Sequence, residues 1–128
     1  MRILITSNII KMLYFSTLKR RIKTTYIAHR GYDMISEKEQ KNIEQFYKAI
    51  LKIKTVEECE AFMDDIATIR ELIDLSSRLQ VAKMLDEGKV FNEIIQETGA
   101  SSATISRVNK CLSYGSGGYR TILDRMKK

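Results

Sequence analysis

The stretch Gly99-Ala100-Ser101-Ser102-Ala103-Thr104-Ile105-Ser106-Arg107 decides the fold of this chain. Gly99 lacks a Cβ and can therefore adopt the positive φ that a sharp turn between two helices requires. Ser101 or Ser102 can then cap the next helix by accepting a hydrogen bond from its free N–H groups. Beyond the cap, apolar residues recur at helical spacing, at Ile105, Val108 and Leu112. The stretch predicts a tight turn followed by a short helix with one buried face.

The opposite side of this helix carries small polar groups and cations. These candidate DNA-binding residues are Ser101, Ser102, Ala103, Thr104, Ser106, Arg107 and Lys110. Small hydrogen-bonding groups suit the base edges of DNA, whereas cations suit its phosphates. We therefore expect residues 101–104 to read bases and Arg107 and Lys110 to hold the backbone.

A helix-turn-helix over about residues 91–112 accommodates this turn. With Phe91 as the first of its twenty positions, the apolar or small positions of the motif fall on Ile94, Gly99, Ala100, Ile105 and Val108. Such residues let two short helices pack at a steep angle. Ile95 departs from the pattern, because the fifth position is usually small where the helices approach most closely. An ordinary helical hairpin with the same turn is the alternative.

Three capping boxes divide residues 36–86 into helices. Ser36, Thr55 and Thr68 are each followed three residues later by a glutamate, so the two side chains can satisfy the first backbone N–H groups reciprocally. Apolar residues at helical spacing follow each box, and Gly88 ends the last of these helices. No segment within residues 36–112 alternates for long enough to form a strand. The sequence predicts an all-α fold of about six helices.

The apolar stripes of the first two predicted helices are wide and carry Phe46, Tyr47 and Phe62. An ordered part of about 95 residues cannot easily bury two such faces by itself. A second copy would cover them, and a two-fold dimer matches the half-sites that helix-turn-helix regulators read. We expect a homodimer, with a compact monomer as the alternative.

Charge is unevenly distributed along the 128 residues. Residues 1–36 carry a net charge of +6, residues 37–97 of −5 and residues 98–128 of +5. A basic end that faces phosphate and an acidic body that faces away would produce this polarity, although small helical proteins also acquire it by chance. The distribution supports double-stranded DNA as the partner.

Residues that could support catalysis or bind a metal are sparse. His29 is the only histidine, and Cys59 and Cys111 lie at spacings typical of helical core residues. Two such cysteines indicate reduced thiols in a cytoplasmic protein, not a disulfide or a metal site. No apolar run reaches the roughly 18 residues that a membrane span needs. We expect no enzyme, no metal and no membrane partner.

Residues 1–35 differ from the rest, because short apolar runs alternate with basic residues and no helical period is sustained. Three hypotheses account for them: a basic arm along DNA, a disordered leader, or an upstream extension from a mis-set start codon. We favour the last, because the organised sequence begins at Met34. The helical DNA-binding domain is expected over residues 36–128.

The glycine-rich stretch Ser113–Gly118 predicts a break after the reading helix. Apolar residues from Tyr119 to Met126 then predict one more short amphipathic helix. A phosphate loop is not favoured, because no strand precedes the glycines and no Gly-Lys-Ser/Thr follows. We expect the break to let the last helix fold back on the dimer.

The motif Gly99-Ala100-x-x-Ala103-Thr104-Ile105-Ser106-Arg107, preceded by Leu85-Asp86-Glu87-Gly88, resembles the Trp repressor family. Together with Phe62-Met63-Asp64-Asp65, Leu79-Gln80-Val81-Ala82-Lys83 and Asn109-Lys110-Cys111-Leu112-Ser113-Tyr114-Gly115, it is similar to the YerC/YecD-type branch of that family. The resemblance covers roughly residues 38–126. It implies an all-helical DNA-binding fold that dimerises through interleaved N-terminal helices.

The resemblance also implies candidate ligand residues. In the tryptophan-responsive repressor, a threonine and two arginines hold the corepressor, and their positions match Thr68, Arg78 and Arg107. Two guanidinium groups can clamp a carboxylate, or they can pair with acids or phosphates. The glycine after the second arginine is Val108 here, and the serine that receives the amino group of the ligand is Cys111. Both differences fill or weaken the pocket, so tryptophan is disfavoured and any corepressor is of unknown identity.

We therefore expect a dimeric, sequence-specific transcriptional regulator whose reading helix begins near Ser102 and enters the major groove at each half-site. The alternative is a protein-interaction module that keeps the fold without independent DNA binding. Salt-dependent binding to duplex DNA separates the two, because phosphate contacts release counterions.

Overall fold

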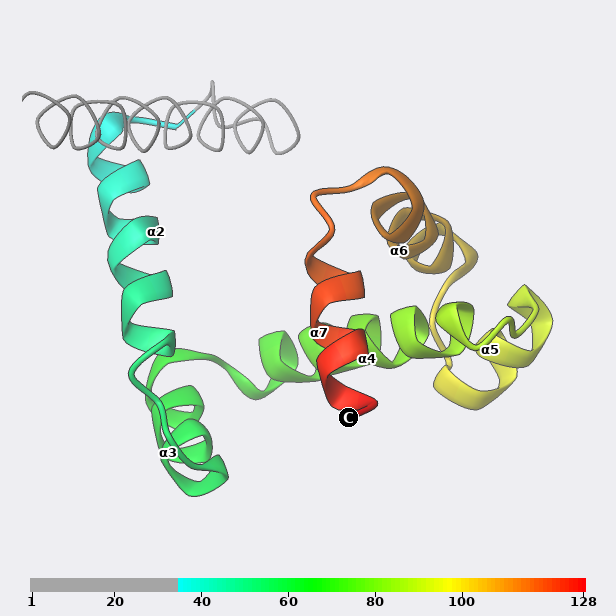
Figure 1. The fold of residues 1–128 in the computed structure, drawn as a ribbon, viewed down its shortest axis with the longest axis horizontal. Coiled ribbons are helices and arrows are strands. Elements are labelled where there is room, and N and C mark those ends of the chain that lie inside the picture. Colours follow the sequence, from blue (N-terminus) through cyan, green and yellow to red (C-terminus); the bar gives the residue numbers. More distant parts are fainter. Residues whose placement is uncertain (1–34) are drawn as a thin grey trace, which may run out of the picture. The chain divides into compact units, whose positions relative to one another are not determined.

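The computed structural model describes residues 35–128, which form six helices and no strand (Figure 1). The helices are α2 (Glu37–Ile50), α3 (Val56–Ile66), α4 (Ile69–Asp86), α5 (Phe91–Thr98), α6 (Ser102–Tyr114) and α7 (Gly118–Met126). The all-α prediction and the expected number of helices are confirmed for this part of the chain. The prediction of a basic leader, with its three alternatives, lies almost entirely outside the described residues.

The chain divides into two compact units, with the boundary after Glu44. The described part of the first unit is the N-terminal part of α2 and the residues that precede it. Here the Ser36 hydroxyl accepts a hydrogen bond from the Glu39 N–H at 3.3 Å, and the Glu39 carboxylate accepts from the Ser36 N–H at 2.7 Å. The predicted capping box at the start of α2 is therefore present.

Of the two capping boxes that the sequence predicts in the second unit, residues 45–128, one is complete and one is half formed. At the start of α4, the Thr68 hydroxyl accepts from the Glu71 N–H and the Glu71 carboxylate accepts from the Thr68 N–H. At the start of α3, the Thr55 hydroxyl accepts from the Glu58 N–H, but the Glu58 carboxylate accepts from the N–H of Lys54 instead. The reciprocal half of the box predicted at Thr55 is thus displaced by one residue.

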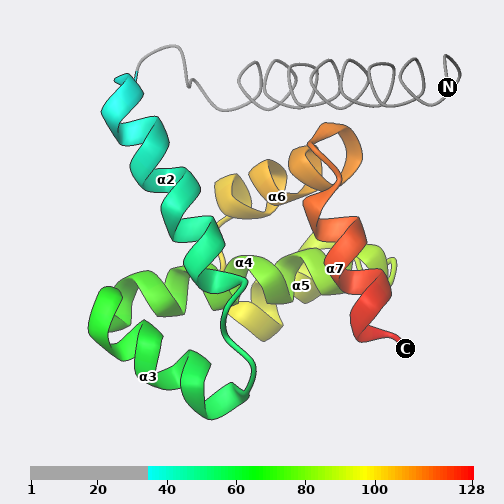
Figure 2. The same ribbon diagram turned by 60° about the vertical axis from the view of Figure 1, so that its left-hand side comes forward.

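The core of the second unit lies between residues 81 and 123. Eight hydrophobic residues of the described chain are at most 7% exposed: Val81, Ala82, Met84, Ile94, Ile105, Val108, Leu112 and Leu123. Helix α4 packs against α5, α6 and α7, and α6 also packs against α5 and α7 (Figure 2). The second half of α4 is therefore the scaffold on which the two helices of the predicted motif are fixed.

Helix α4 ends before Gly88, as the sequence predicts. The Gly88 N–H donates to the carbonyl of Leu85, and the Lys89 N–H donates to the carbonyl of Met84, both at 3.0 Å. This Schellman motif satisfies carbonyl groups that the helix end leaves without partners. It also turns the chain directly into α5.

Three residues, 115–117, connect α6 to α7. A Cβ on Gly115 would lie 2.2 Å from the carbonyl oxygen of Cys111, so this close exit from α6 requires glycine. Helix α7 then folds back on α4 and α6 of its own chain and buries Leu123. The last helix, α7, therefore packs against helices of its own chain.

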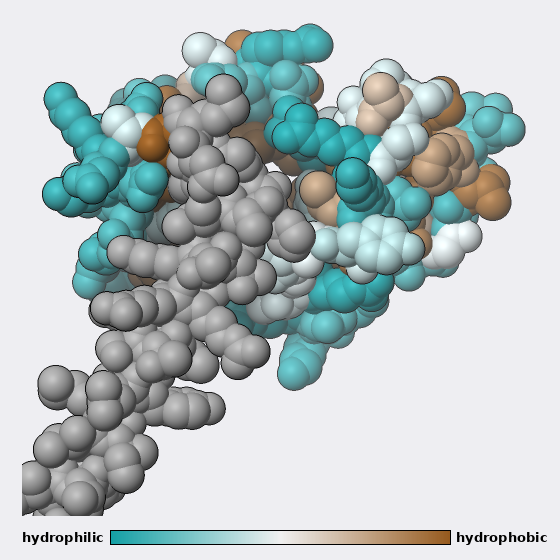
Figure 3. All heavy atoms as spheres, turned by 90° about the horizontal axis from the view of Figure 1, so that it is seen from above, coloured by the Kyte–Doolittle hydropathy of each residue, from teal (hydrophilic) through white to brown (hydrophobic). Residues whose placement is uncertain are grey.

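The helices before this core leave apolar side chains in solvent. No residue of α2 or α3, both within the described chain, is buried. The large hydrophobic residues between 37% and 82% exposed in this region are Phe46, Tyr47, Leu51, Val56, Ile66, Ile69, Ile73 and Leu75. In the space-filling view, hydrophobic residues drawn in brown are visible among hydrophilic ones on the surface of the molecule (Figure 3). The rings of Phe46 and Phe62 stack with centroids 6.3 Å apart, which covers this apolar surface only in part.

Candidate nucleic-acid interface

The turn between α5 and α6 has the geometry that the sequence predicts. Gly99 has a φ of +66°, and its N–H donates to the carbonyl of Ile95 at 2.9 Å. Thr98 completes the turn, because its hydroxyl donates to the carbonyl of Ile94 at 2.6 Å and accepts from the N–H of Ala100 at 3.1 Å. Sequence reasoning missed Thr98. Its position directly before the glycine is the available signal, since threonine hydroxyls often bond to nearby backbone groups.

Ser101, not Ser102, caps the helix that follows. Its hydroxyl accepts from the Thr104 N–H at 3.2 Å and lies 3.0 Å from the Thr104 hydroxyl. Helix α6 begins at Ser102 and ends at Tyr114, two residues beyond the predicted end of the motif. The first turn of α6 is therefore fixed by its own side chains.

Helix α6 has a buried apolar face and an exposed polar one. Ile105, Val108 and Leu112 are 0%, 2% and 7% exposed. Of the predicted DNA-binding residues, Thr104 is half-buried and the others are exposed: Ser101, Ser102, Ala103, Ser106, Arg107 and Lys110. Residues 102–114 include two cations and no carboxylate. An exposed helix face with this composition is suited to an anionic partner.

Helix α5 packs behind α6. Ile94 is completely buried, and Ile95, the residue that departs from the usual motif, is half-buried against the core. At the start of α5, the Val90 side chain cannot accept a hydrogen bond. The Glu93 carboxylate accepts one from the Val90 N–H at 3.0 Å. The larger residue at position 95 is thus accommodated by packing against the core.

The cysteines are both free, and Cys111 corrects an expectation. Cys59 is half-buried, but Cys111 is exposed and does not belong to the core. The buried stripe of α6 is narrow, because it runs through Val108 and Leu112 alone in this part of the helix. Cys111 lies outside that stripe.

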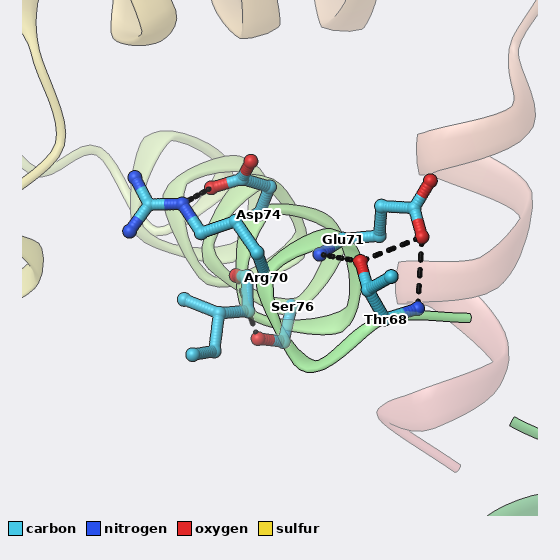
Figure 4. A network of polar contacts seen from close by, with 6 residues as sticks. Thr68, Arg70, Glu71, Asp74 and Ser76 are labelled. Atoms are coloured by element: carbon cyan, nitrogen blue, oxygen red, sulfur yellow. Dashed lines mark hydrogen bonds and ion pairs between the residues drawn. The ribbon is translucent and has the colours of Figure 1, made fainter. Parts of the chain in front are cut away.

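The structure does not bring the three candidate ligand residues together in one chain. Thr68 and Arg78 are ten residues apart on α4, which separates them by about 15 Å along the helix axis. The Thr68 hydroxyl is also engaged by Glu71, to whose carboxylate it donates at 2.7 Å (Figure 4). Bonds from the N–H and hydroxyl of Thr68 hold the pKa of Glu71 below its ordinary value. Arg78 and Arg107 are exposed, so both guanidinium groups can reach a ligand or a phosphate.

Val108 occupies the position at which the resemblance places a glycine. Its side chain is 2% exposed and belongs to the core between α4 and α6. Space that a glycine would leave beside the reading helix is therefore filled by the chain itself.

A cluster of charges that sequence reasoning missed joins the ends of α4, α6 and α7. Lys127 donates to Asp86 at 2.5 Å, and the Arg120 guanidinium lies 4.0 Å from the same carboxylate. The hydrogen bond from Lys127 holds the pKa of Asp86 below its ordinary value, with help from the charges of Lys127 and Arg120, and Asp86 in turn raises the pKa of Lys127. Arg120 Nε also donates to the carbonyl of Leu112 in α6 at 3.1 Å. Asp86 and Lys127 are 41 residues apart, so no local pattern could have indicated their contact.

Residues 35–128 contain neither a group of side chains suited to a metal ion nor a membrane-spanning helix. No three His, Cys, Asp or Glu side chains in this range are grouped so that they could hold a metal ion. Nor does the range contain a helix that is long and apolar enough to cross a membrane.

The turn and the packing of α5 and α6 on α4 define a helix-turn-helix protein. The sequence matches the family model for the Trp repressor protein over residues 41–127. It is 50% identical over 88 residues to the uncharacterised protein YerC of Bacillus subtilis (strain 168), covering 69% of this chain and 85% of YerC. The chain therefore belongs to the Trp repressor family, which is named for a regulator and not for an enzyme.

Two solved structures are similar in fold and in sequence. One is a TrpR-like protein from Eubacterium eligens ATCC 27750, with a TM-score of 0.66 and 45% identity, covering 68% of this chain and 90% of that chain. The other is a candidate Trp repressor from Staphylococcus aureus, with a TM-score of 0.66 and 44% identity, covering 73% of this chain and 96% of that chain. The resemblance seen in the sequence is thus confirmed at the level of family and fold.

Proposed function

We propose that the chain is a sequence-specific DNA-binding transcription regulator that inserts α6 into the major groove. The observation that carries the proposal is the division of α6 into a buried face and an exposed face without a carboxylate. Ile105 and Val108 anchor the helix, while Arg107 and Lys110 reach solvent. Helix-turn-helix proteins read DNA with the N-terminal residues of such a helix. Membership in the Trp repressor family supports the same function.

The exposed residues of α6 have different roles in this proposal. Ser102 and Ala103 present the smallest side chains at the N-terminal end and read base edges. Ser101 and Thr104 have hydroxyls 3.0 Å apart, so each has less remaining capacity to bond a base. Arg107 and Lys110 hold phosphates, and Ser106 is exposed beside Arg107.

The regulator acts as a homodimer in this proposal. Eight large hydrophobic residues between Phe46 and Leu75 are at least 37% exposed in the single chain. Stable interfaces bury about 1,200–2,000 Å² in total, and contiguous apolar surface that stays in water is uncommon in monomers. A second copy that covers this surface would also supply the second reading helix for a two-fold operator.

We further propose that operator binding does not require tryptophan. Val108 already fills the space beside the reading helix, and the Thr68 hydroxyl is engaged by Glu71. A ligand that touched both Thr68 and Arg78 would need one of them from a second copy, because they are about 15 Å apart on one helix.

The experiment that tests the function is selection from a random duplex pool by the purified full chain at near-physiological salt. It is run with and without L-tryptophan. Enrichment of the same two-fold symmetric site in both conditions is the expected outcome. Enrichment only with tryptophan would overturn the ligand proposal, and enrichment of no sequence would favour the protein-interaction alternative.

A matched pair of variants tests the role of α6 on the enriched duplex. Arg107→Ala is expected to weaken binding to all sequences and to lower the salt slope by about one, because one phosphate contact is lost. Arg70→Ala is the control, since it removes the same charge from α4, where Arg70 lies 3.6 Å from Asp74. Equal losses in both variants would mean that Arg107 acts only through net charge.

A further inference from the structure

The ends of three helices meet at one guanidinium group. Arg120, in the first turn of α7, donates from Nε to the carbonyl of Leu112 near the end of α6. Its Nη1 faces the carboxylate of Asp86, the last residue of α4. Asp86 is held in turn by Lys127 at the far end of α7, and its side chain is only 17% exposed. Asp86, Arg120, Lys127 and the Leu112 carbonyl form a cluster that we call the C-terminal brace.

The brace supplies what the end of α6 lacks. The last carbonyl groups of a helix have no partners within the helix and carry partial negative charge. The Gly115 N–H satisfies the carbonyl of Cys111, but the last turn of α6 contains no basic residue. The Arg120 guanidinium therefore provides both a donor and a positive charge at this helix end.

We propose that Arg120 is a positioning residue, which fixes the direction of the reading helix α6 against α4 and so determines how selectively DNA is bound. The proposal rests on the function proposed above. The turn at Gly99 and the Ser101 cap hold one end of α6, and the brace holds the other. With both ends held, the exposed face keeps one orientation.

A small tilt of α6 weakens its hydrogen bonds to bases more than its contacts to phosphates. A helix of 13 residues is about 20 Å long, so a tilt of about 5° displaces one end relative to the other by about 2 Å. Hydrogen bonds to base edges weaken over a few tenths of an ångström. Long cationic side chains can follow a phosphate over such a distance. Loss of the brace should therefore reduce selective binding while it leaves non-selective binding largely intact.

The first test compares Arg120→Gln with Arg125→Gln in the full chain. Both remove one positive charge from α7, so long-range attraction to DNA falls equally. Affinity is measured for the duplex enriched by selection and for a scrambled duplex of the same length. We expect equal losses on the scrambled duplex, and for Arg120→Gln an additional loss of about three- to tenfold on the enriched duplex. Equal losses on both duplexes would overturn the proposal.

Asp86→Asn gives a second test with the opposite sign of charge. This change removes a negative charge, so simple electrostatics predicts tighter binding to any DNA. The brace predicts weaker binding to the enriched duplex, because Arg120 and Lys127 lose their common anchor. Tighter binding to both duplexes would contradict the brace. Arg120→Lys should restore the charge but not the bridging, since one ammonium lacks the planar fork that spans two acceptors.

Amide hydrogen exchange without DNA separates this proposal from the function on which it rests. Arg120→Gln should accelerate exchange of the Gly115 and Tyr114 amides at the end of α6, whereas Arg125→Gln should not. Unchanged exchange would overturn the brace, whatever the DNA result. If selection enriches no duplex while exchange is accelerated, the brace stands as a structural contact and the DNA-binding function fails.

Discussion

Two regions of the second unit contain similar residues but pack in opposite ways. Residues 81–123 hold all eight buried hydrophobic residues of the described chain, and we call them the closed region. Residues 46–75 hold none, although eight of their large apolar side chains are at least 37% exposed, and we call them the open region. Helix α4 belongs to both, since Val81 is fully buried while Ile73 is 49% exposed on the same helix. An apolar helix face therefore predicts that the face is buried. It does not predict whether the same chain or a second chain buries it.

The difference between the regions matches the two tasks in the proposed function. In the closed region, α4 and α7 pack against α6, whose residues Ile105, Val108 and Leu112 are buried within one chain. The open region offers an unused apolar face for a second copy. The predictions below test this division, beginning with the largest expected effect.

The largest effect on stability is expected in the closed region. Ile105→Ala removes a side chain with 0% exposure and should lower the free energy of unfolding by about 2–5 kcal/mol, because it leaves a cavity. Urea denaturation at low protein concentration measures this loss. Ile73→Ala is the control in the open region and should cost less than about 1 kcal/mol under the same conditions. Similar losses in the two variants would remove the distinction between the regions.

The open region should show its effect in the oligomeric state. Ile69 is 73% exposed, so Ile69→Asp should not disturb the fold of a single chain. In a dimer it would place a carboxylate in the interface and raise the dissociation constant by more than about thirtyfold. Sedimentation velocity over a concentration series measures this change. Ile122→Asp on α7 is the control and should leave the dimer intact. A wild-type protein that remains monomeric at every concentration would contradict the role given to the open region.

A smaller effect is expected at the turn of the closed region. Gly99 has a φ of +66° and open space around the position of a Cβ, so only backbone strain opposes a side chain there. Gly99→Ala should cost about 1 kcal/mol of stability, and Gly99→Asn should cost less because asparagine tolerates this conformation. Thermal denaturation ranks the two variants. Equal losses of stability in the two variants would mean that the loss comes from contact with a neighbouring group and not from backbone strain.

The smallest expected effects concern the pKa values of two carboxylates, Glu71 at the start of α4 and Asp86 at its end. The folded-state pKa of Glu71 is lowered by Thr68, and that of Asp86 by Lys127. Each carboxylate therefore adds stability that is fully present above its ordinary pKa of about 4 and is lost as pH falls through the lowered folded value. In a carboxyl NMR titration, Thr68→Ala should raise only the pKa of Glu71, and Lys127→Met only that of Asp86. A variant that moves both values would show that the two sites are coupled.

Much of the fold and part of the candidate interface could be predicted from the sequence, because the signals are local. Ser36 and Thr68 cap helices where their boxes predict, and the apolar spacing after Gly99 identifies the buried face of α6. Two local patterns predicted more than the structure shows. Cys111 lies at an apparently apolar spacing but is exposed, because the stripe of α6 is narrower than its periodicity indicates. The box at Thr55 is incomplete, because the Glu58 carboxylate has the N–H of Lys54 within reach as well.

The sequence by itself determined the helices, the turn at Gly99 and the family, because capping, chain reversal and apolar periodicity act over a few residues. Only the tertiary structure decided which apolar faces the chain covers for itself and which it leaves open. It also decided that Asp86 meets Lys127 across 41 residues. These outcomes depend on how whole helices pack, and the same helical period is compatible with a covered face and an uncovered one.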